Sequence, residues 1–348
     1  MPYPRHGRAR NKANVHEKTP QTSWPPLRET PTVSVIIPAY NCGAYLAETL
    51  DSVLAQDYPR LEILVIDDGS KDDTVAVAES YGPPVRVLHQ QGSGNGAGPS
   101  RNTGLRTASG EVIAFLDGDD VWLPGKLNAQ LACLREHPES AMVATDFTLW
   151  YPQEDNHWRA SGQFAEEYHH TDPHQLDPTY SGWLYHRLLL ETCVWTGTVV
   201  MRRELVDEIG LFREDLRLGQ DYDYWIRASR HTPILTLQRP FALYRRHGES
   251  ATKRWAPVNY ELKVFEDALH TWGREGPDGE SISPAQIRRR RFGLHFSMGY
   301  KQYWNGQKRD SLHSFVNALR LRPMHWRTAA YVFVTIAQSA YACARHAR

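Results

Sequence analysis

Residues 99–120 read PSRNTGLRTASGEVIAFLDGDD, and this stretch decides the fold. Pro99–Ala108 predicts a helix that begins at a proline, as many helices do. The apolar run Val112–Leu116 predicts a strand that is buried on both faces, and Asp117 ends it. A helix followed by a doubly buried strand and an acidic turn is typical of an α/β protein.

The same alternation extends toward the N-terminus. Short β-branched runs predict three more buried strands, at Val33–Ile37, Ile63–Ile66 and Val85–Leu88, with Pro38 ending the first. Helical spacing predicts helices at Ala44–Gln56 and Asp73–Ser80, the second opened by a capping box of Ser70 and Asp73. We therefore expect a mostly parallel central sheet with helices on both faces. Ligands bind such sheets beyond the carboxyl ends of the strands.

The C-terminal two thirds of the chain have a different character. Residues 150–183 lack periodicity and are rich in Trp, Tyr, His, Asp and Pro, which indicates a long functional loop or insertion. Val194–Met201 predicts a strand and Asp221–Ser229 a helix. Residues 256–348 read as a helical C-terminal region, in which the basic run Arg288–Arg291 indicates a solvated helix face.

Composition excludes several classes of protein. Forty basic residues balance forty acidic ones, so no global field attracts nucleic acid, and we expect no nucleic-acid partner. The four cysteines are far apart and form no C-x-x-C pair, which favours a reducing, cytoplasmic location. Residues 1–31 are polar and Pro-rich, and predict a disordered leader rather than a signal peptide.

Ala329–Ala344 is the most apolar long segment, but it is short for a membrane span and contains polar residues. A terminal packing helix is the favoured interpretation. The alternative is a peripheral contact of the C-terminal helices, including Arg288–Arg291, with the inner face of the membrane.

Acidic pairs follow two of the predicted strands. Asp67 and Asp68 come after the second strand, and Asp117 and Asp119 after the fourth. Loop carboxylates often only cap helices, but two clusters at one sheet edge favour a bound cation or ligand. An Asp-x-Asp turn offers hard oxygen ligands, which suit Mg²⁺ or Mn²⁺ carrying phosphate oxygens. Gly118 between the two allows a tight turn.

A Gly-rich loop, GSGNGAG, covers residues 92–98 and matches the G-x-G-x-x-A spacing of dinucleotide sites. It follows the third predicted strand, whereas a dinucleotide fold places its glycines after the first. The loop instead indicates close approach of the backbone to a ligand, with Arg101 directed at a diphosphate.

Four motifs occur in the order expected of one family. They are VSVIIPAYN at 33–41, VIDDGSKDDT at 65–74, PSRNTGLRTASGEVIAFLDGDD at 99–120 and GQDYDYWIR at 219–227, and YRRHGESAT at 244–252 adds a fifth element. Together they resemble the family 2 glycosyltransferases, which are inverting enzymes with the GT-A fold. The resemblance covers residues 32–250. It implies a GT-A domain at 32–255, divided into a nucleotide-sugar half at 32–120 and an acceptor half at 121–255.

The resemblance also implies roles for individual residues. Eight would bind the nucleotide, namely Pro38, Ala39, Tyr40, Asn41, Asp67, Asp68, Arg101 and Asp117. Asp119 and His247 would hold a Mn²⁺ or Mg²⁺ ion, and Asp221 would be the catalytic base. Gln220 departs from the family, in which many members have glutamate, so the base assignment depends on Asp221 alone. Arg245 and Arg246, beside His247, suit an anionic diphosphate.

The resemblance and the residue types together predict transfer of a sugar, UDP-linked by family habit, to a hydroxyl of a glycan or glycolipid. Cell-envelope polysaccharide biosynthesis is the expected setting, with a nucleotide-sugar donor and a glycan or lipid-linked saccharide acceptor. Aromatic residues expected on the acceptor side are Trp183, Tyr185, Trp195, Tyr222, Tyr224 and Trp225, although core packing is favoured for Trp195 and Trp225. Two alternatives stay open: a sugar nucleotidyltransferase, and a nucleotide-sugar-binding module without turnover.

Overall fold

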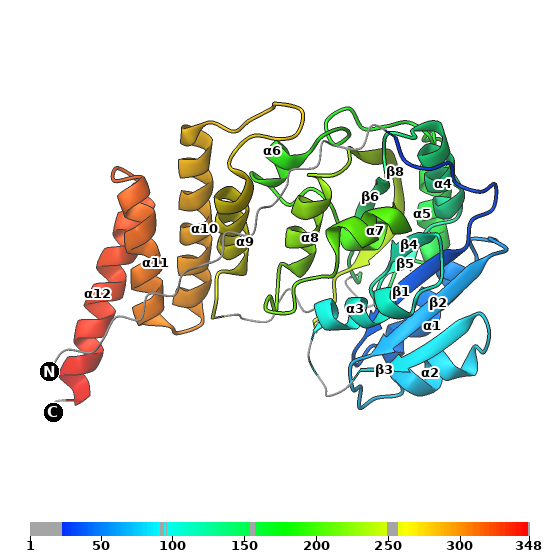
Figure 1. Cartoon of the computed structure of the whole chain (residues 1–348). Coiled ribbons are helices and arrows are strands. Elements are labelled where there is room, and N and C mark those ends of the chain that lie inside the picture. Colours follow the sequence, from blue (N-terminus) through cyan, green and yellow to red (C-terminus); the bar gives the residue numbers. More distant parts are fainter. Residues whose placement is uncertain (1–22, 91–93, 95, 154–156, 249–256, 347–348) are drawn as a thin grey trace, which may run out of the picture.

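The computed structural model describes residues 23–90, 94, 96–153, 157–248 and 257–346, without the side chains of 339–346. One eight-stranded sheet organises the molecule, in the order β3-β2-β1-β4-β7-β6-β8-β5 (Figure 1). The strands are β1 Val33–Ala39, β2 Leu61–Asp67, β3 Val85–His89, β4 Val112–Phe115, β5 Val121–Trp122, β6 Met142–Trp150, β7 Val200–Arg202 and β8 Ile234–Arg245. Strands β1 to β4 pair with one another in parallel, as predicted.

Helices cover both faces of the sheet, which confirms the predicted fold class. Those that pack around the sheet are α1 Gly43–Leu54, α2 Thr74–Ser80, α3 Ala97–Thr107, α4 Lys126–Glu136, α5 Ser161–Tyr168, α6 Tyr185–Leu188, α7 Arg203–Ile209 and α8 Gln220–Ala228. Alternate residues of β1 enter opposite cores. Ile36 packs with α3, α7 and α8, while Val35 and Ile37 pack with α1 and α4.

Four further helices extend from the sheet in a row, at the left of Figure 1. They are α9 Tyr260–Trp272, α10 Pro284–Trp304, α11 Lys308–Leu321 and α12 Trp326–His346. Each packs on the one before it. Within the described part of the chain, no helix combines the length and the hydropathy needed to cross a bilayer.

Three predictions about elements are corrected by the structure. Strand β1 continues through Pro38 to Ala39, because its pairing with β4 ends at Ile36 and the missing N–H of Pro38 interrupts no ladder there. The expected strand over 194–201 is a 3₁₀ turn, Thr196–Thr198, followed by β7. The region 150–183 contains helix α5, whose Phe164 packs against Trp150.

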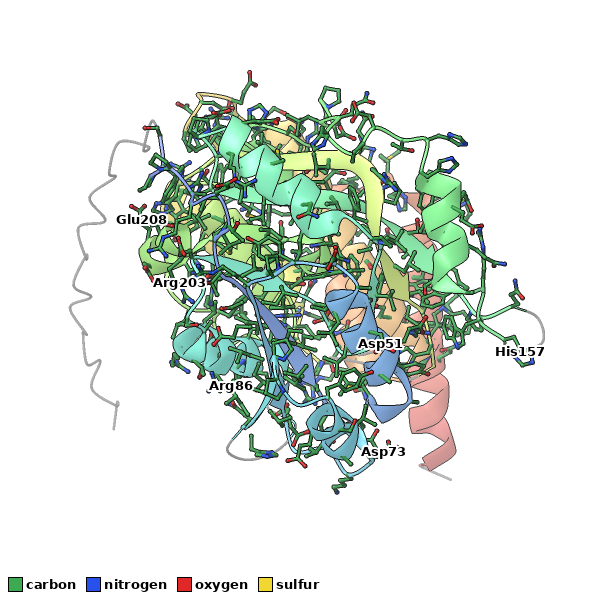
Figure 2. The ribbon with its side chains drawn as sticks, turned by 90° about the vertical axis from the view of Figure 1, so that its right-hand side faces the viewer. Asp51, Asp73, Arg86, His157, Arg203 and Glu208 are labelled. Atoms are coloured by element: carbon green, nitrogen blue, oxygen red, sulfur yellow. The ribbon has the colours of Figure 1, made fainter. Side chains whose placement is uncertain are left out.

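The predicted capping box of Ser70 and Asp73 does not form. Asp73 is exposed at the start of α2 (Figure 2) and accepts no capping hydrogen bond. The carboxylate of Asp72 accepts from the Thr74 and Gly43 amides instead, and so joins the starts of α2 and α1. The Ser70 hydroxyl accepts from the Asn41 amide.

Two predicted boundaries shift. Residues 23–31 were expected in the leader, but Trp24 is 3% exposed in the core and Arg202 donates to the Pro25 carbonyl. Residues 1–22 lie outside the described part of the chain. In the basic run, Arg290 and Arg291 pair with Glu261 and Glu266 of α9, so only half of the run is a solvated face.

Candidate active site

The loops that follow β1 and β2 are joined through Asn41. Its backbone lies in the left-handed region, with φ of 50°, which asparagine tolerates better than most residues. The Asn41 amide donates to Ser70 Oγ at 3.0 Å, and Asn41 Oδ1 accepts from the Lys71 amide at 2.8 Å. The predicted base-binding segment, residues 38–41, is therefore fixed against the next loop of the sheet edge.

The Asp67 and Asp68 carboxylates both hold loop backbone. Asp67 accepts from the amides of Gly69 and Ser70, which closes the turn after β2. Oδ2 of Asp68 accepts from the Gly96 amide at 2.8 Å and so ties the Gly-rich loop to the end of β2. Both residues are at least 95% buried. The structure thus adds a loop-positioning role to the nucleotide contact implied by the resemblance.

Arg101, on α3, lies against Asp117 at the end of β4. Its Nη2 is 2.5 Å from Oδ1 of Asp117, and Arg101 is 3% exposed. No described group accepts a hydrogen bond from its Nε or Nη1. Burial raises the pKa of Asp117, Arg101 lowers it, and the charges of Asp119 and Asp221 raise it further. Asp117 therefore lies close enough to Asp119 and to Asp221 for the charge of each to repel its own.

Asp119 and His247 meet although they are 128 positions apart. Nε2 of His247 lies 2.8 Å from Oδ2 of Asp119, and the Tyr45 ring of α1 lies 4.6 Å from the imidazole, centroid to centroid. His247 lies two residues after the end of β8, which brings it to the turn after β4. The two predicted metal ligands are thus adjacent.

Arg245 fixes the end of β8 to that turn, a role that sequence reasoning missed. It is 2% exposed, its Nε donates to the Asp119 carbonyl and its Nη2 lies 2.6 Å from Oε2 of Glu48. Its guanidinium also lies 4.1 Å from the Trp150 ring. The expected diphosphate contact is therefore wrong for Arg245. The sequence contains one signal of this structural role, which is that Arg245 follows apolar residues typical of a buried strand.

Asp120 is the buried partner of this arrangement. It is fully buried, and its Oδ1 accepts from the Arg245 amide at 2.8 Å. Burial raises the pKa of Asp120 well above its usual range, and the nearby charges of Asp119 and Asp117 raise it further. The turn after β4 thus carries three carboxylates, of which Asp120 faces the interior.

Asp221 lies in the first turn of α8, after Gly219 in the left-handed conformation. Its Oδ1 accepts from the Tyr222 amide at 2.8 Å, and its Oδ2 accepts from Thr196 Oγ1 at 3.3 Å. Gln220, at the position where the family often has glutamate, is 7% exposed and packs against Gly98 of α3. Asp221 is therefore the only carboxylate of the Gln220–Asp221 pair and the less buried of the two residues.

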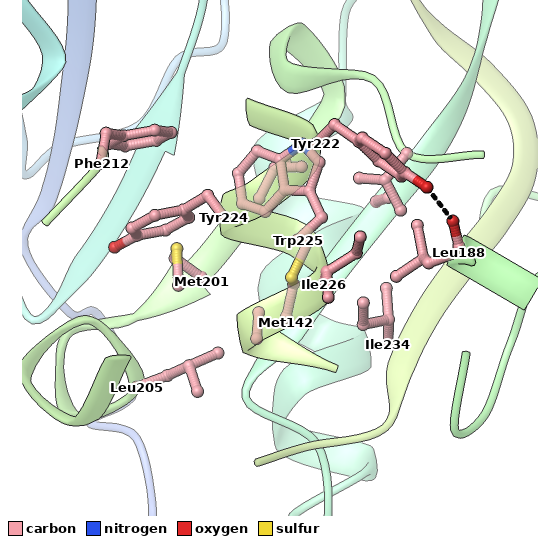
Figure 3. Packing of buried hydrophobic residues seen from close by; sticks show 14 of the residues in the cluster. Met142, Leu188, Met201, Leu205, Phe212, Tyr222, Tyr224, Trp225, Ile226 and Ile234 are labelled. Carbon is pink, nitrogen blue, oxygen red and sulfur yellow. Dashed lines mark hydrogen bonds between the residues drawn. The ribbon is translucent and has the colours of Figure 1, made fainter. Parts of the chain in front are cut away.

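Most of the aromatic residues expected at the acceptor side are core residues. Tyr185, Tyr222, Tyr224 and Trp225 are each at most 4% exposed, and Figure 3 shows three of them packed in one cluster. The Tyr222 hydroxyl donates to the Leu188 carbonyl there. The prediction that they bind an acceptor is wrong for Tyr185, Tyr222 and Tyr224, whereas the core packing favoured for Trp225 is confirmed. The apolar faces of α6 and α8 belong to the main hydrophobic core.

Trp195 differs, since it is half-buried beside the site. Its ring centroid lies 4.8 Å from that of Phe147 and 4.9 Å from that of Tyr244. Phe147 follows the register shift at Asp146 in β6, and such bulges redirect side chains. The next residue, Thr196, donates to Asp221. We call Phe147, Trp195 and Tyr244 the aromatic trio.

The sequence pattern described as "Glycosyl transferase family 2" matches residues 34–209, half of the chain. The chain belongs to glycosyl transferase family 2. The matched range contains strands β1 to β7, except Val33, together with Asp117 and Asp119. Asp221 and His247 follow the matched range. Membership of this family excludes the alternative of a sugar nucleotidyltransferase.

Relatives in the family are bacterial glycosyltransferases. The chain is 31% identical to "Uncharacterized glycosyltransferase RP339" of Rickettsia prowazekii, over 68% of this chain and 70% of that one. It is also 31% identical to TuaG of Bacillus subtilis, whose name assigns it to teichuronic acid biosynthesis, over 72% of this chain and 88% of that one. A Rickettsia felis glycosyltransferase is 30% identical over 68% of this chain, and the match spans only 37% of that longer protein.

Solved glycosyltransferases share the GT-A fold. TarS 1-349 of S. aureus, in complex with UDP-GlcNAc, superposes with a TM-score of 0.61 at 21% identity, covering 86% of this chain and 84% of that one. PcManGT, a mannosyltransferase of Pyrobaculum calidifontis in complex with GDP-Man and Mn²⁺, gives a TM-score of 0.54 at 18% identity, over 94% and 86% of the two chains. These likenesses establish the architecture of this family 2 domain.

A divalent cation fits the donor pair of the family 2 site. Asp119 offers a carboxylate oxygen and His247 an imidazole nitrogen, and Mn²⁺ accepts both kinds of ligand. Mg²⁺ and Mn²⁺ commonly keep water and phosphate oxygens as further ligands. Across the described ranges, no cluster of three or more His, Cys, Asp or Glu is arranged for a metal.

Proposed function

We propose that the chain is an inverting glycosyltransferase that uses a nucleotide-diphosphate sugar. The observation that carries this proposal is that Asp117, the Asp119–His247 pair and Asp221 come from distant parts of the sequence to one end of the sheet. Parallel sheets bind ligands at the carboxyl ends of their strands. Sugar transfer from a nucleotide-sugar requires a base next to the diphosphate site.

The donor site combines three groups of residues. Residues 38–41 would line the base, and Asp117, with Asp67 or Asp68, would bind base or ribose. Asp119 and His247 would hold Mn²⁺ or Mg²⁺, which stabilises the charge of the leaving diphosphate. UDP is the favoured nucleotide because TarS is solved with UDP-GlcNAc, and GDP, as in PcManGT, is the competing choice.

Asp221 would accept the proton from the attacking hydroxyl of the acceptor. Thr196 Oγ1 and the Tyr222 amide donate to its two oxygens, so the carboxylate is held in one orientation. A single base and a single displacement give inversion at the anomeric carbon. The mechanism requires no second carboxylate as nucleophile.

The acceptor would be a saccharide. The aromatic trio lies beside Thr196, the partner of Asp221, and half-exposed aromatic faces stack on sugar rings. A glycan or lipid-linked saccharide of the cell envelope suits this site, and TuaG is named for such a polymer. A cytoplasmic location stays a prediction.

The test combines binding and turnover. Calorimetric titration with UDP, GDP and dTDP, each with Mn²⁺ or with EDTA, should give tight binding of UDP only with the metal. Asp221→Asn should lower the transfer or hydrolysis of the UDP-sugar by about 10²- to 10⁴-fold and leave UDP binding unchanged. Asp207→Asn, an exposed substitution on α7, is the matched control.

Two outcomes would overturn parts of the proposal. Near-normal turnover by Asp221→Asn would remove it as the base. Nucleotide binding without transfer to any saccharide, in the unmodified chain, would favour a binding module without turnover.

A further inference from the structure

Helix α12 is the outermost element of the C-terminal row, as Figure 1 shows. It packs on α11 and on the aromatic side chains of α10. Tyr331 provides the main contact, stacked on Phe315 of α11 at 4.8 Å and in contact with Tyr300 and Tyr303 of α10. One side of α12 is therefore committed to the protein.

Apart from Tyr331, the described part of α12 turns polar side chains to the protein and large apolar ones outward. Thr328 and Thr335 are fully buried on the side that faces the protein. Trp326 is 71% exposed, Phe333 74% and Ile336 51%. These three recur at helical spacing and share one outward stripe, and Met324, just before the helix, is 95% exposed. We call Met324, Trp326, Phe333 and Ile336 the α12 face.

The charge around this face is strongly positive. The whole chain is neutral, but residues 301–348 contain eight Lys or Arg and one acidic residue, Asp310. Arg320 near the end of α11, Arg322 in the connection and Arg327 in the first turns of α12 are exposed, and no described carboxylate pairs with them. Arg322 instead lies over the Phe292 ring and Arg327 over the Trp326 ring.

Charge decides which partner covers the face. Two copies of the chain meeting through it would bring their unpaired arginines together, and like charges oppose such a dimer. An anionic bilayer matches both properties, because acyl chains accept the apolar stripe and phosphates accept the arginines. We propose that the α12 face binds the interface of an anionic membrane, with Trp326, Phe333 and Ile336 inserted at the acyl boundary.

The proposal goes beyond sugar transfer and does not depend on it. Sedimentation of the full chain is measured with vesicles of phosphatidylcholine alone and with vesicles that also contain phosphatidylglycerol. We expect binding only to the anionic vesicles, weakened by added salt. Trp326→Ser with Phe333→Ser should lower the partition coefficient by about tenfold or more. Arg322→Gln with Arg327→Gln should lower it by roughly fivefold for each charge removed.

Matched variants separate the face from general effects. Arg86→Gln with Arg106→Gln removes the same charge from exposed sites on β3 and α3, and Figure 2 shows Arg86 at the outer surface. Leu54→Ser removes a partly exposed apolar residue of α1. Both controls should sediment like the unmodified chain. Thermal unfolding of all variants checks that the exposed substitutions leave the fold intact.

Three results would overturn the proposal. They are equal sedimentation with neutral vesicles, binding by the Trp326 and Phe333 double variant equal to that of the controls, and a dimer of the free chain that this double variant dissociates. The last would make a second copy the occupant. Hydrolysis of the UDP-sugar in the absence of vesicles should be unchanged in every variant, so failure of membrane binding is distinguishable from failure of the enzyme assignment.

Discussion

Nε2 of His247 lies 2.8 Å from Oδ2 of Asp119, and β8 delivers the histidine to a turn formed 128 positions earlier. We predict that both residues provide the metal-dependent part of nucleotide binding. His247→Gln and Asp119→Asn should each weaken UDP binding in Mn²⁺ by about tenfold or more, which is about 1.4 kcal/mol, and the double variant should lose little more. Calorimetric titration of each variant with UDP in the presence of Mn²⁺ measures these affinities.

The control for that prediction is a second histidine–carboxylate pair. Nδ1 of His231 lies 3.1 Å from Oε2 of Glu208, at the surface away from the site (Figure 2 labels Glu208). His231→Gln should leave UDP binding unchanged. Equal affinity with Mn²⁺ and with EDTA in the unmodified chain would contradict the assignment of the pair.

Trp195 should set the affinity for the acceptor. Trp195→Ala removes the ring between Phe147 and Tyr244, so the KM for a saccharide acceptor should rise by about tenfold while UDP binding stays unchanged. Trp195→Phe keeps an aromatic face and should recover most of the loss. Steady-state kinetics with varied acceptor measures both, and an effect confined to the donor would contradict the prediction.

Gly118 has no room for a side chain. A Cβ there would lie 2.8 Å from Sγ of Cys42 and 3.2 Å from the Pro38 carbonyl. Gly118→Ala should therefore move the Asp117–Asp119 turn and lower stability by about 1–3 kcal/mol, with a larger loss of turnover. Adding Cys42→Ala should recover part of the stability, as urea unfolding would measure. Gly162→Ala, with open space around it, is the control.

Arg245 should be essential to stability rather than to diphosphate binding. Arg245→Met leaves the Asp119 carbonyl and Glu48 without their donor, and losing hydrogen bonds from a buried guanidinium costs about 1–3 kcal/mol, since Glu48 is 42% exposed and can be hydrated. Arg239→Met, on the same strand, removes only a contact with Phe241 and should cost far less. Urea unfolding measures the difference, and equal losses would contradict the prediction.

Lys126 should make stability depend on pH. It is fully buried, with Nζ 2.8 Å from Oε1 of Gln130, and burial lowers its pKa well below the usual range. The folded chain then binds fewer protons than the unfolded chain, so stability rises with pH up to the pKa of the unfolded lysine, about 10.4. Relative to Lys126→Met, the unmodified chain should gain stability as the pH rises toward about 10.4, and urea unfolding across this range measures the gain.

Local patterns predicted the first half of the fold well. The apolar strands β1 to β4 and helices α1 to α3 lie within a few residues of their predicted bounds, because doubly buried parallel strands give continuous apolar runs. The strand predicted over 194–201 is wrong. Val194, Val199 and Val200 give the β-branched pattern of a strand, but Thr196–Thr198 form a 3₁₀ turn. The acidic turn was predicted from its place directly after a buried strand, whereas the role of His247 came from the family resemblance, whose motifs locate residues that spacing alone does not bring together.

Long-range contacts account for what could not be predicted. Arg245 was expected to contact a diphosphate, but the pairing of β8 with β5 brings it to Asp120 and Glu48. Likewise, Tyr224 and Trp225 follow an acidic residue, but their helix packs its apolar face on the sheet. Local sequence does not contain the partner that decides either outcome.

The position of β8 between β6 and β5 has a consequence for synthesis of the chain. Strand β5, Val121–Trp122, pairs with β8 at Leu243 and Ala242, and so its partner leaves the ribosome about 120 residues later. Until then β5 is unpaired, and β6 lacks its neighbour on the side opposite β7. Pairing over such separations slows folding and lengthens the time in which aggregation competes. Premature termination before residue 242 would thus leave β5 unpaired and the site without His247.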